Sequence, residues 1–217
     1  MDLFPLYNSI RIALVSTVII FFLGIFLAYY IARFPRYIKV ILDVILTLPL
    51  VLPPTVVGYM LLIILGPKSA FGNFVYETFH TRLVMNWWSA IFATTVVAFP
   101  LMYRTARGAF ESFDENLASA GKTLGLSDTF IFWKIRMPYC KKGLMAGTVL
   151  SFARALGEYG ATSMIAGYTP RRTATISTTV YQLWRTNDEK MALVWVLINV
   201  VISAAVLLLI SNFEKRL

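Results

Sequence analysis

The chain has 217 residues, of which 58% are hydrophobic and only 14% charged, and its mean hydropathy is +0.70. Soluble globular domains are about 45–50% apolar and about 25% charged, so this composition excludes an ordinary soluble domain and indicates an integral membrane protein. One cysteine and one histidine are too few for an internal disulfide or a typical zinc or haem site, and the net charge of +9 is scattered in short clusters, unlike the basic stripe of a nucleic-acid-binding protein.

Five apolar runs predict five transmembrane helices. Four of them, 12–32, 44–67, 83–103 and 191–213, contain no charged residue, and each is long enough to cross a hydrocarbon core of about 30 Å. A fifth, 143–167, has the same length but contains Arg154 and Glu158. We therefore expect the chain, 1–217, to be one transmembrane domain with spans at about 10–33, 40–66, 84–108, 143–167 and 191–213. The loop 109–141 would lie outside the lipid.

The basic residues between the spans predict the orientation. One side of the membrane would collect twelve of them: Arg33, Arg36, Lys39, Arg104, Arg107, Lys122, Lys134, Arg136, Lys141, Lys142, Lys215 and Arg216. The other side would collect seven: Arg11, Lys68, Arg82, Arg171, Arg172, Arg185 and Lys190. Because cytoplasmic loops carry an excess of Lys and Arg, we expect the first side to be cytoplasmic, with the N-terminus outside and the C-terminus inside.

Prolines predict interruptions in two of the spans. Pro49, Pro53 and Pro54 fall in the second span, and Pro100 lies near the inner end of the third. Each proline removes a backbone donor and clashes with the carbonyl group four residues earlier. Such a bend is expected to face protein or a water-filled path. The alternative is a kink that only shapes the packing of helices.

The loop between the third and fourth spans is patterned as two short helices. Asp114 is placed to cap a helix that runs to Leu124, and Gly125 to end that helix in the left-handed conformation. Ser127 or Asp128 would cap a second helix, 129–136, which Pro138 would stop. The result would be a compact knob, comprising residues 114–136. The alternative is a solvated amphipathic connector.

The knob contains an incomplete match to a nucleotide-binding motif. Residues 121–123, Gly-Lys-Thr, reproduce the end of a phosphate-binding loop, but Asn116 stands where that loop requires glycine. No buried strand precedes it. We therefore expect the chain to have no nucleotide site of its own.

The same loop resembles the signature of the permease subunits of binding-protein-dependent ABC importers. That signature is Glu-Ala-Ala, three residues, Gly, nine residues, then Ile-x-Leu-Pro. The chain has Ser119-Ala120-Gly121, then Gly125, then residues 135–138 in this register, with Ser for Glu, Gly for the second Ala and Met for Leu. In the family this loop couples the permease to its ATPase. The resemblance implies an ATPase-coupling set of Ser119, Ala120, Gly121, Leu124, Gly125, Ile135 and Pro138, with Gly121 at the closest approach.

Three further stretches are similar to those of molybdate-importer permeases: residues 48–59, 152–162 and 173–181. Sulfate-importer permeases share much of the second stretch. The resemblance implies an all-α, MetI-like permease that works as a homodimer in the cell membrane and moves an oxyanion by alternating access. It implies two separate ATPase subunits, which bind ATP and Mg²⁺, and an external solute-binding protein, with no cofactor and no catalysis in this chain. The alternative substrates are tungstate and sulfate. The alternative function is that of a self-sufficient channel or an ion-coupled carrier.

The fourth span holds a charged pair whose role has two interpretations. Arg154 and Glu158 are four residues apart, hence on one helical face, and intramembrane charges normally pair or face a cavity. We favour a neutralised pair that locks the span to a neighbour over a lining of the path. For the path itself we expect neutral hydroxyl groups, and the candidates are Thr94, Thr95, Thr148 and Ser151. Lys39 and Asp43, also four apart, are expected to stabilise a surface.

Overall fold

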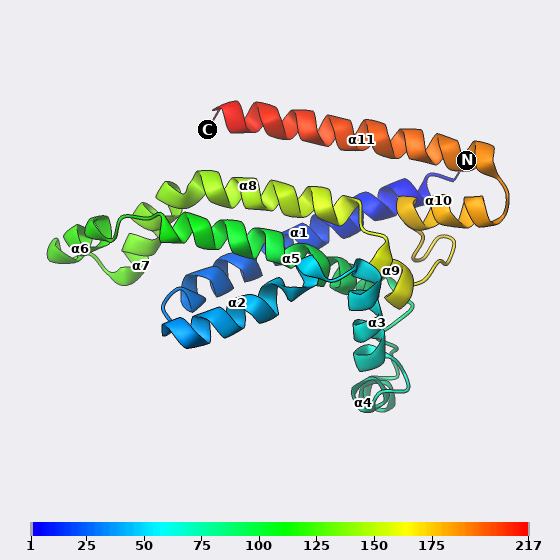
Figure 1. The fold of residues 1–217 in the computed structure, drawn as a ribbon, viewed down its shortest axis with the longest axis horizontal. Coiled ribbons are helices and arrows are strands. Elements are labelled where there is room, and N and C mark those ends of the chain that lie inside the picture. The colour runs from blue at the N-terminus through cyan, green and yellow to red at the C-terminus, as the bar shows by residue number, and fades with distance from the viewer. Residues whose placement is uncertain (1, 217) are drawn as a thin grey trace.

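The computed structural model describes residues 2–216, and the surroundings of side chains from residue 2 to residue 208. Within this range the chain forms helices and loops and no strand (Figure 1). The helices are α1 (Phe4–Ile31), α2 (Arg36–Val51), α3 (Pro54–Leu65), α4 (Ala70–Phe79), α5 (Trp87–Glu111), α6 (Glu115–Thr123), α7 (Asp128–Ile131), the π-helix η1 (Phe132–Arg136), α8 (Met137–Leu156), α9 (Gly160–Ile165), α10 (Ile176–Arg185) and α11 (Glu189–Arg216). The predicted all-α class is confirmed.

Helix α5 is the centre of the bundle, with α1 and α8 packed along it (Figure 1). Small residues let these backbones approach closely, as is typical of membrane helices. A Cβ atom added at Gly24 of α1 would lie 2.6 Å from Cγ of Met102, and one added at Gly143 of α8 would lie 2.7 Å from Cβ of Ala109. The core therefore depends on residues with little or no side chain where α1 and α8 touch α5.

Two long helices are only lightly packed. Helix α2 has no buried residue, and α11 lies along the outside of the bundle, where its main contacts are with α10 and α8 (Figure 1). Most of their exposed side chains are nevertheless apolar, such as Val51 and Leu208, which are 82% and 67% exposed. These two surfaces are suited to lipid or to another chain.

The knob lies at one end of the bundle, and α4 and α10 lie toward the other (Figure 1). Helices α1, α5 and α11 run toward the knob, and α8 runs away from it. The knob carries Lys122, Lys134 and Arg136 of the first predicted set of basic residues, and the loop after α9 carries Arg171 and Arg172 of the second. The orientation across the membrane stays a prediction. The side chains of Lys215 and Arg216 lie outside the part that the structure describes.

The second predicted span is two helices rather than one. Helices α2 and α3 meet at an angle of 113° at Leu52 and Pro53, here called the first break. Both residues precede a proline, which disfavours the helical conformation, and both are extended, with ψ of 142° and 134°. Pro49, by contrast, lies inside α2. In the third span, α5 continues through Pro100, so the interruption expected there does not occur.

The fourth predicted span is also divided. Helix α8 ends at Leu156 and α9 begins at Gly160, and the residues between them, 157–159, are here called the second break. Helix α8 also begins earlier than expected, within the loop predicted to lie outside the lipid. Helix α10 was not among the predicted elements; the side chain of Thr175 caps it by accepting a hydrogen bond from the Thr178 N–H.

Two helices, α1 and α11, are long and apolar enough to cross a membrane, and α2 with α3 would make a third if the bent pair counts as one span. Helices α5 and α8 carry charged residues near the knob, for example Arg107 and Lys141. The structure therefore supports a helical membrane protein, and the count of five spans stays a prediction.

The close approach of α8 to α5 can be tested with two glycine substitutions. In Gly147→Ala the new Cβ would overlap Thr105 Oγ1 and lie 2.9 Å from the Met102 sulfur, whereas in Gly108→Ala it would meet nothing within 4 Å. Both changes gain about 1 kcal/mol of helix propensity, but overpacking costs about 1–3 kcal/mol. We expect Gly147→Ala to melt at a lower temperature than Gly108→Ala in detergent. Equal melting temperatures would contradict the packing described here.

Candidate functional site

The knob is built by local capping interactions. Asp114 caps α6 by accepting a hydrogen bond from the Asn116 N–H at 2.9 Å. Gly125 ends α6 in the left-handed region, with φ of 78°, and the Leu126 N–H donates back to the Gly121 carbonyl group at 3.1 Å. Ser127 then caps α7. These boundaries agree with the predicted caps and turn.

The inner face of the knob differs from the expected one. Gly121 is buried, and a Cβ atom added to it would lie 3.2 Å from the side chain of Ile131 and 3.5 Å from that of Ile135. Ala118 is buried on the same face. Gly121 therefore lets α6 pack on α7 and η1 and is not placed on the outer surface, where it was expected.

The outer surface of α6 carries a short apolar stripe instead. Leu117 and Leu124 are 42% and 79% exposed, and Ala120 is exposed between them. Of the other residues predicted to couple to an ATPase, Ser119, Gly125 and Pro138 are exposed and Ile135 is half-buried. A partner could therefore contact Ser119, Ala120, Leu124 and Gly125 directly, while Gly121 and Ile135 support the shape of the knob.

Pro138 does not stop the second helix of the knob. The chain passes from α7 through the π-helix η1 into α8, and Pro138 occupies the first turn of α8. Proline is tolerated in a first turn because its missing N–H is not needed there, and the wider π-turn, in which the Met137 N–H donates to the Phe132 carbonyl group, precedes it. The knob is thus continuous with a long helix of the bundle.

Aromatic and charged contacts fix the knob to α1 and α5. The rings of Tyr29 in α1 and Phe132 in η1 meet edge to face, with centroids 4.6 Å apart. The ring of Phe110 in α5 lies 6.5 Å from that of Phe132 between centroids, and the guanidinium group of Arg136 lies over the Tyr29 ring at 5.6 Å. Within the knob, Arg136 donates to both carboxylate oxygens of Glu115 at 2.8 Å. The knob is therefore held in a defined position relative to the bundle.

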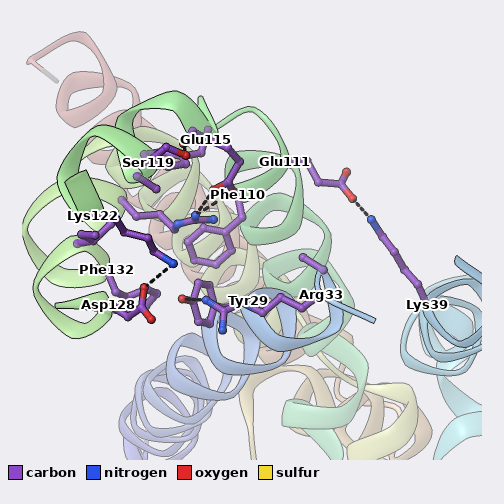
Figure 2. Close-up of a pocket in the computed structure, with 15 residues that line it drawn as sticks. Tyr29, Arg33, Lys39, Phe110, Glu111, Glu115, Ser119, Lys122, Asp128 and Phe132 are labelled. Atoms are coloured by element: carbon purple, nitrogen blue, oxygen red, sulfur yellow. Dashed lines mark hydrogen bonds and ion pairs between the residues drawn. The ribbon is translucent and has the colours of Figure 1, made fainter. Parts of the chain in front are cut away.

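A cavity of about 510 Å³ lies between the knob and the ends of α1 and α5 (Figure 2). Lys122 and Asp128, 2.9 Å apart, pair across its edge. The hydrogen bond from Lys122 lowers the pKa of the Asp128 carboxyl group, and the charge of Arg33 adds to this shift. The cavity is thus lined by groups of both charges, and the ionised form of Asp128 is favoured there.

Charged contacts also tie α2 to α5. Lys39 lies 2.6 Å from Glu111, while Asp43 pairs with Arg107 and accepts a hydrogen bond from the Tyr103 hydroxyl group at 2.5 Å. From their spacing, Lys39 and Asp43 were expected to stabilise a surface. They instead bind residues of α5. No local pattern could show this, because the partners lie 60 to 72 residues away in the sequence.

The predicted pair of intramembrane charges lies at the second break. Arg154 Nη1 lies 2.6 Å from Glu158 Oε2, and the two groups form an ion pair whose geometry is not that of a hydrogen bond. The other carboxylate oxygen, Glu158 Oε1, accepts a hydrogen bond from the Ala161 N–H at 2.8 Å. Glu158 follows the end of α8 and does not continue its face. Its side chain is 2% exposed and that of Arg154 is 30% exposed. The carboxylate thus serves the start of α9, and Arg154 neutralises it.

The helices that begin directly after the two breaks, α3 and α9, pack on each other. A Cβ atom added at Gly160 would lie 2.9 Å from Cβ of Pro54, and one added at Gly58 would lie 2.6 Å from Cα of Ala161. Two of the stretches that carry the resemblance to molybdate-importer permeases, 48–59 and 152–162, therefore meet in space. The third, 173–181, is fixed to α1, where the Ser9 hydroxyl group accepts from the Ile176 N–H at 2.9 Å.

Several hydroxyl groups lie beside the second break, and only some of them belong to residues that were predicted to line the path. The hydroxyl oxygens of Thr94 and Thr162 lie 3.5 Å apart. Both residues line a hollow of about 10 Å³, which Glu158 also lines. The predicted Thr95 and Ser151 have buried hydroxyl groups without a hydrogen-bond partner among the described residues. Ser9, Thr162 and Thr175, which also line the hollow, were missed.

The fourth predicted path residue, Thr148, does not join this cluster. Its hydroxyl group donates to the Leu144 carbonyl group of its own helix at 2.8 Å. Serine and threonine residues commonly satisfy themselves in this way within helices. A path lined by Thr148 therefore gains no support from its hydrogen bonding.

Comparisons with known proteins match nearly the whole chain. A family model described as binding-protein-dependent transport system inner membrane component matches residues 20–217. The putative molybdenum transport system permease protein YvgM of Bacillus subtilis (strain 168) is 37% identical over 208 residues, which cover 96% of this chain and 92% of that protein. The molybdenum transport system permease protein ModB of Escherichia coli (strain K12) is 37% identical over 217 residues, covering 98% and 95%.

A solved structure shares the fold. A chain of a bacterial ABC transporter involved in the import of the acidic polysaccharide alginate superposes with a TM-score of 0.79, over 99% of this chain and 79% of that one. The sequence identity is 17%, so the likeness concerns the fold alone.

Because Glu158 is more deeply buried than Arg154, we expect the removal of either charge to reduce the stability of the protein by a different amount. Arg154→Met would leave a buried carboxylate without its cation, which costs about 3–5 kcal/mol, whereas Glu158→Gln would leave a partly exposed guanidinium group at smaller cost. We expect Arg154→Met to lower the melting temperature more, and the double variant to recover most of that loss. Equal losses from the two single changes, or additive losses in the double variant, would contradict the proposed neutralisation.

Proposed function

The chain belongs to the family of binding-protein-dependent transport system inner membrane components, and from this we propose that it is the membrane subunit of an ATP-driven importer of an oxyanion, with molybdate as the substrate. The observation that carries the proposal is the 37% identity, over almost the full length of both chains, to proteins named as molybdenum transport permeases. Tungstate and sulfate share the charge and tetrahedral shape of molybdate, so uptake assays must include both as competitors.

The path of the oxyanion would pass the two breaks. Irregular backbone within a membrane is tolerated where it is buried in protein or lines a water-filled cavity, and the two breaks provide such backbone beside the hydroxyl cluster of Thr94 and Thr162. Neutral hydroxyl groups bind an oxyanion weakly enough to release it, whereas Arg154 is already neutralised by Glu158. A second copy of the chain would complete the path, and the exposed apolar faces of α2 and α11 are available for it.

Energy would enter through the knob. Two copies of a separate ATPase, which bind ATP and Mg²⁺, would receive the outer face of α6, with Ala120 and Leu124 at its centre. Helix α8 runs from the knob to the second break without interruption, so a displacement of the knob would move the second break. ATP-driven closure would thus rock the helices between inward-open and outward-open states. A solute-binding protein would deliver the oxyanion at the opposite end, and this chain would catalyse no reaction itself.

The proposed orientation places the knob in the cytoplasm. Lys122, Lys134 and Arg136 lie in the knob, and Arg33 lies at the nearby end of α1, whereas Arg171 lies in the loop after α9, where it pairs with Asp2 at 2.9 Å. The excess of basic residues at the knob end supports a cytoplasmic location. With five spans, the N-terminus would lie outside the cell membrane and the C-terminus inside.

The coupling role of the knob can be tested with one outward substitution. Ala120→Trp would place a bulky ring at the centre of the exposed stripe, where a clash in a packed interface costs about 1–3 kcal/mol. The fold of the knob should be spared, because Ala120 is exposed. We expect normal membrane insertion, little co-purified ATPase and loss of molybdate uptake.

The matched control is Ala120→Ser, which adds only a hydroxyl group at the same place and should retain the ATPase. Gly121→Trp is unsuitable as the test because it would also disturb the contact with Ile131. Full uptake and a normal amount of ATPase in Ala120→Trp would contradict the coupling role.

A further inference from the structure

Two hollows adjoin where the end of α1 meets the knob. One is the charged cavity of about 510 Å³ already described, and the other is an apolar groove of about 630 Å³ on the outer side of α1. Tyr29, Arg33, Asp128 and Phe132 line both. The boundary between them is therefore a polar mouth beside an apolar channel, an arrangement that suits an amphipathic molecule.

The groove has the length and surface of a site for an acyl chain. It extends along α1 from Phe22 to the end of the helix, which at a rise of 1.5 Å per residue is about 14 Å, and it reaches Arg33 just beyond that end. This is about half of a hydrocarbon core of about 30 Å, hence the depth of one leaflet. Phe22 and Phe26 are 64% and 56% exposed along it. Trp133, 58% exposed, stands at its polar end, where tryptophan is favoured at membrane interfaces.

The charged cavity contains one more cation than its carboxylates require. Glu111 pairs with Lys39, Glu115 with Arg136, and Asp128 with Lys122. Arg33 forms no ion pair with any described side chain; it contacts the hydroxyl group of Tyr29 and lies over the Tyr29 ring at 4.1 Å (Figure 2). The unmatched positive charge thus stands where the cavity and the groove meet.

We propose that this place binds one anionic phospholipid, with its phosphodiester group on Arg33 and one acyl chain in the groove along α1. An arginine side chain matches a phosphate group in both charge and geometry, since its fork of N–H groups can donate two parallel hydrogen bonds. The negative charge of Asp128 faces the same mouth, but Lys122 offsets it at 2.9 Å. The lipid would contact both α1 and the knob, and so connect the coupling element to the bilayer.

Two other occupants predict different behaviour. Inorganic phosphate would satisfy Arg33 but would leave the apolar groove unused. A second copy of the chain would cover the groove but would have to bring a carboxylate to Arg33. The charge and the groove together favour a molecule that carries a phosphate group and an acyl chain in one.

The test is lipid binding to the full chain, purified from membranes in mild detergent. Native mass spectrometry would follow the binding of phosphatidylglycerol and, separately, of phosphatidylcholine, with inorganic phosphate added as competitor. We expect one phosphatidylglycerol per chain, bound more tightly than phosphatidylcholine and not displaced by phosphate. Arg33→Gln should weaken that binding at least about tenfold, because it removes a charge-assisted hydrogen-bonding group.

Arg36→Gln is the matched control, since it removes the same charge three residues away, outside the lining of both hollows. It should bind phosphatidylglycerol as the wild type does, and Arg33→Lys should lose less than Arg33→Gln. An equal loss in Arg33→Gln and Arg36→Gln would show only diffuse surface charge. Displacement by phosphate would indicate a free-anion site, equal binding of the two lipids would indicate a groove that recognises only the acyl chain, and binding of neither lipid would indicate a groove covered by another chain; each result would overturn the proposal.

Discussion

The close contact between α3 and α9, the helices that begin after the two breaks, holds the two interrupted spans together. A helix that is interrupted inside a membrane exposes backbone groups that lipid cannot satisfy. At the first break Pro53 and Pro54 have no N–H to satisfy, and at the second break the Glu158 carboxylate accepts the Ala161 N–H. Gly160 lets the second break lie directly on Pro54. The intramembrane charge of Glu158, and its partner Arg154, follow from this need.

The same helices that form the breaks also carry the knob. Helix α8 reaches from η1 to the second break, α5 reaches the knob from beside Thr94, and α2 is attached to α5 through Lys39 and Asp43. The knob is in turn attached to α1 through Tyr29 and Phe132. A transporter driven from one end needs such continuity, because force applied at the coupling element must reach the path through rigid elements.

Much of the local structure could be predicted from the sequence. The caps at Asp114 and Ser127 and the left-handed turn at Gly125 depend on interactions within a few residues, and each lies where its residue type predicts. The location of the long helices was also predictable, since apolar runs determine it. The bend at Pro53 follows from the restriction that each proline imposes on the residue before it.

The rest depends on contacts between distant parts of the chain. The small residues of the knob suggested an outer docking face, but only the position of Ile131 shows that Gly121 faces inward. The spacing of Lys39 and Asp43 suggested a pair within one helix, whereas partners on α5 bind both. Pro138 suggested a helix end, whereas the π-helix η1 continues directly into α8. In each case a local pattern admitted two structures, and tertiary packing selected one.

We propose that this chain moves molybdate only when an ATPase acts on its knob. The most direct test of this proposal is uptake of labelled molybdate into proteoliposomes that contain the chain and the solute-binding protein, with and without the ATPase and ATP. We expect uptake only when both ATPase and ATP are present, and we expect tungstate or sulfate to reduce it to the extent that the binding protein accepts them. Uptake by the chain alone, at a rate unchanged by ATPase and ATP, would contradict this proposal and would indicate a channel or an ion-coupled carrier.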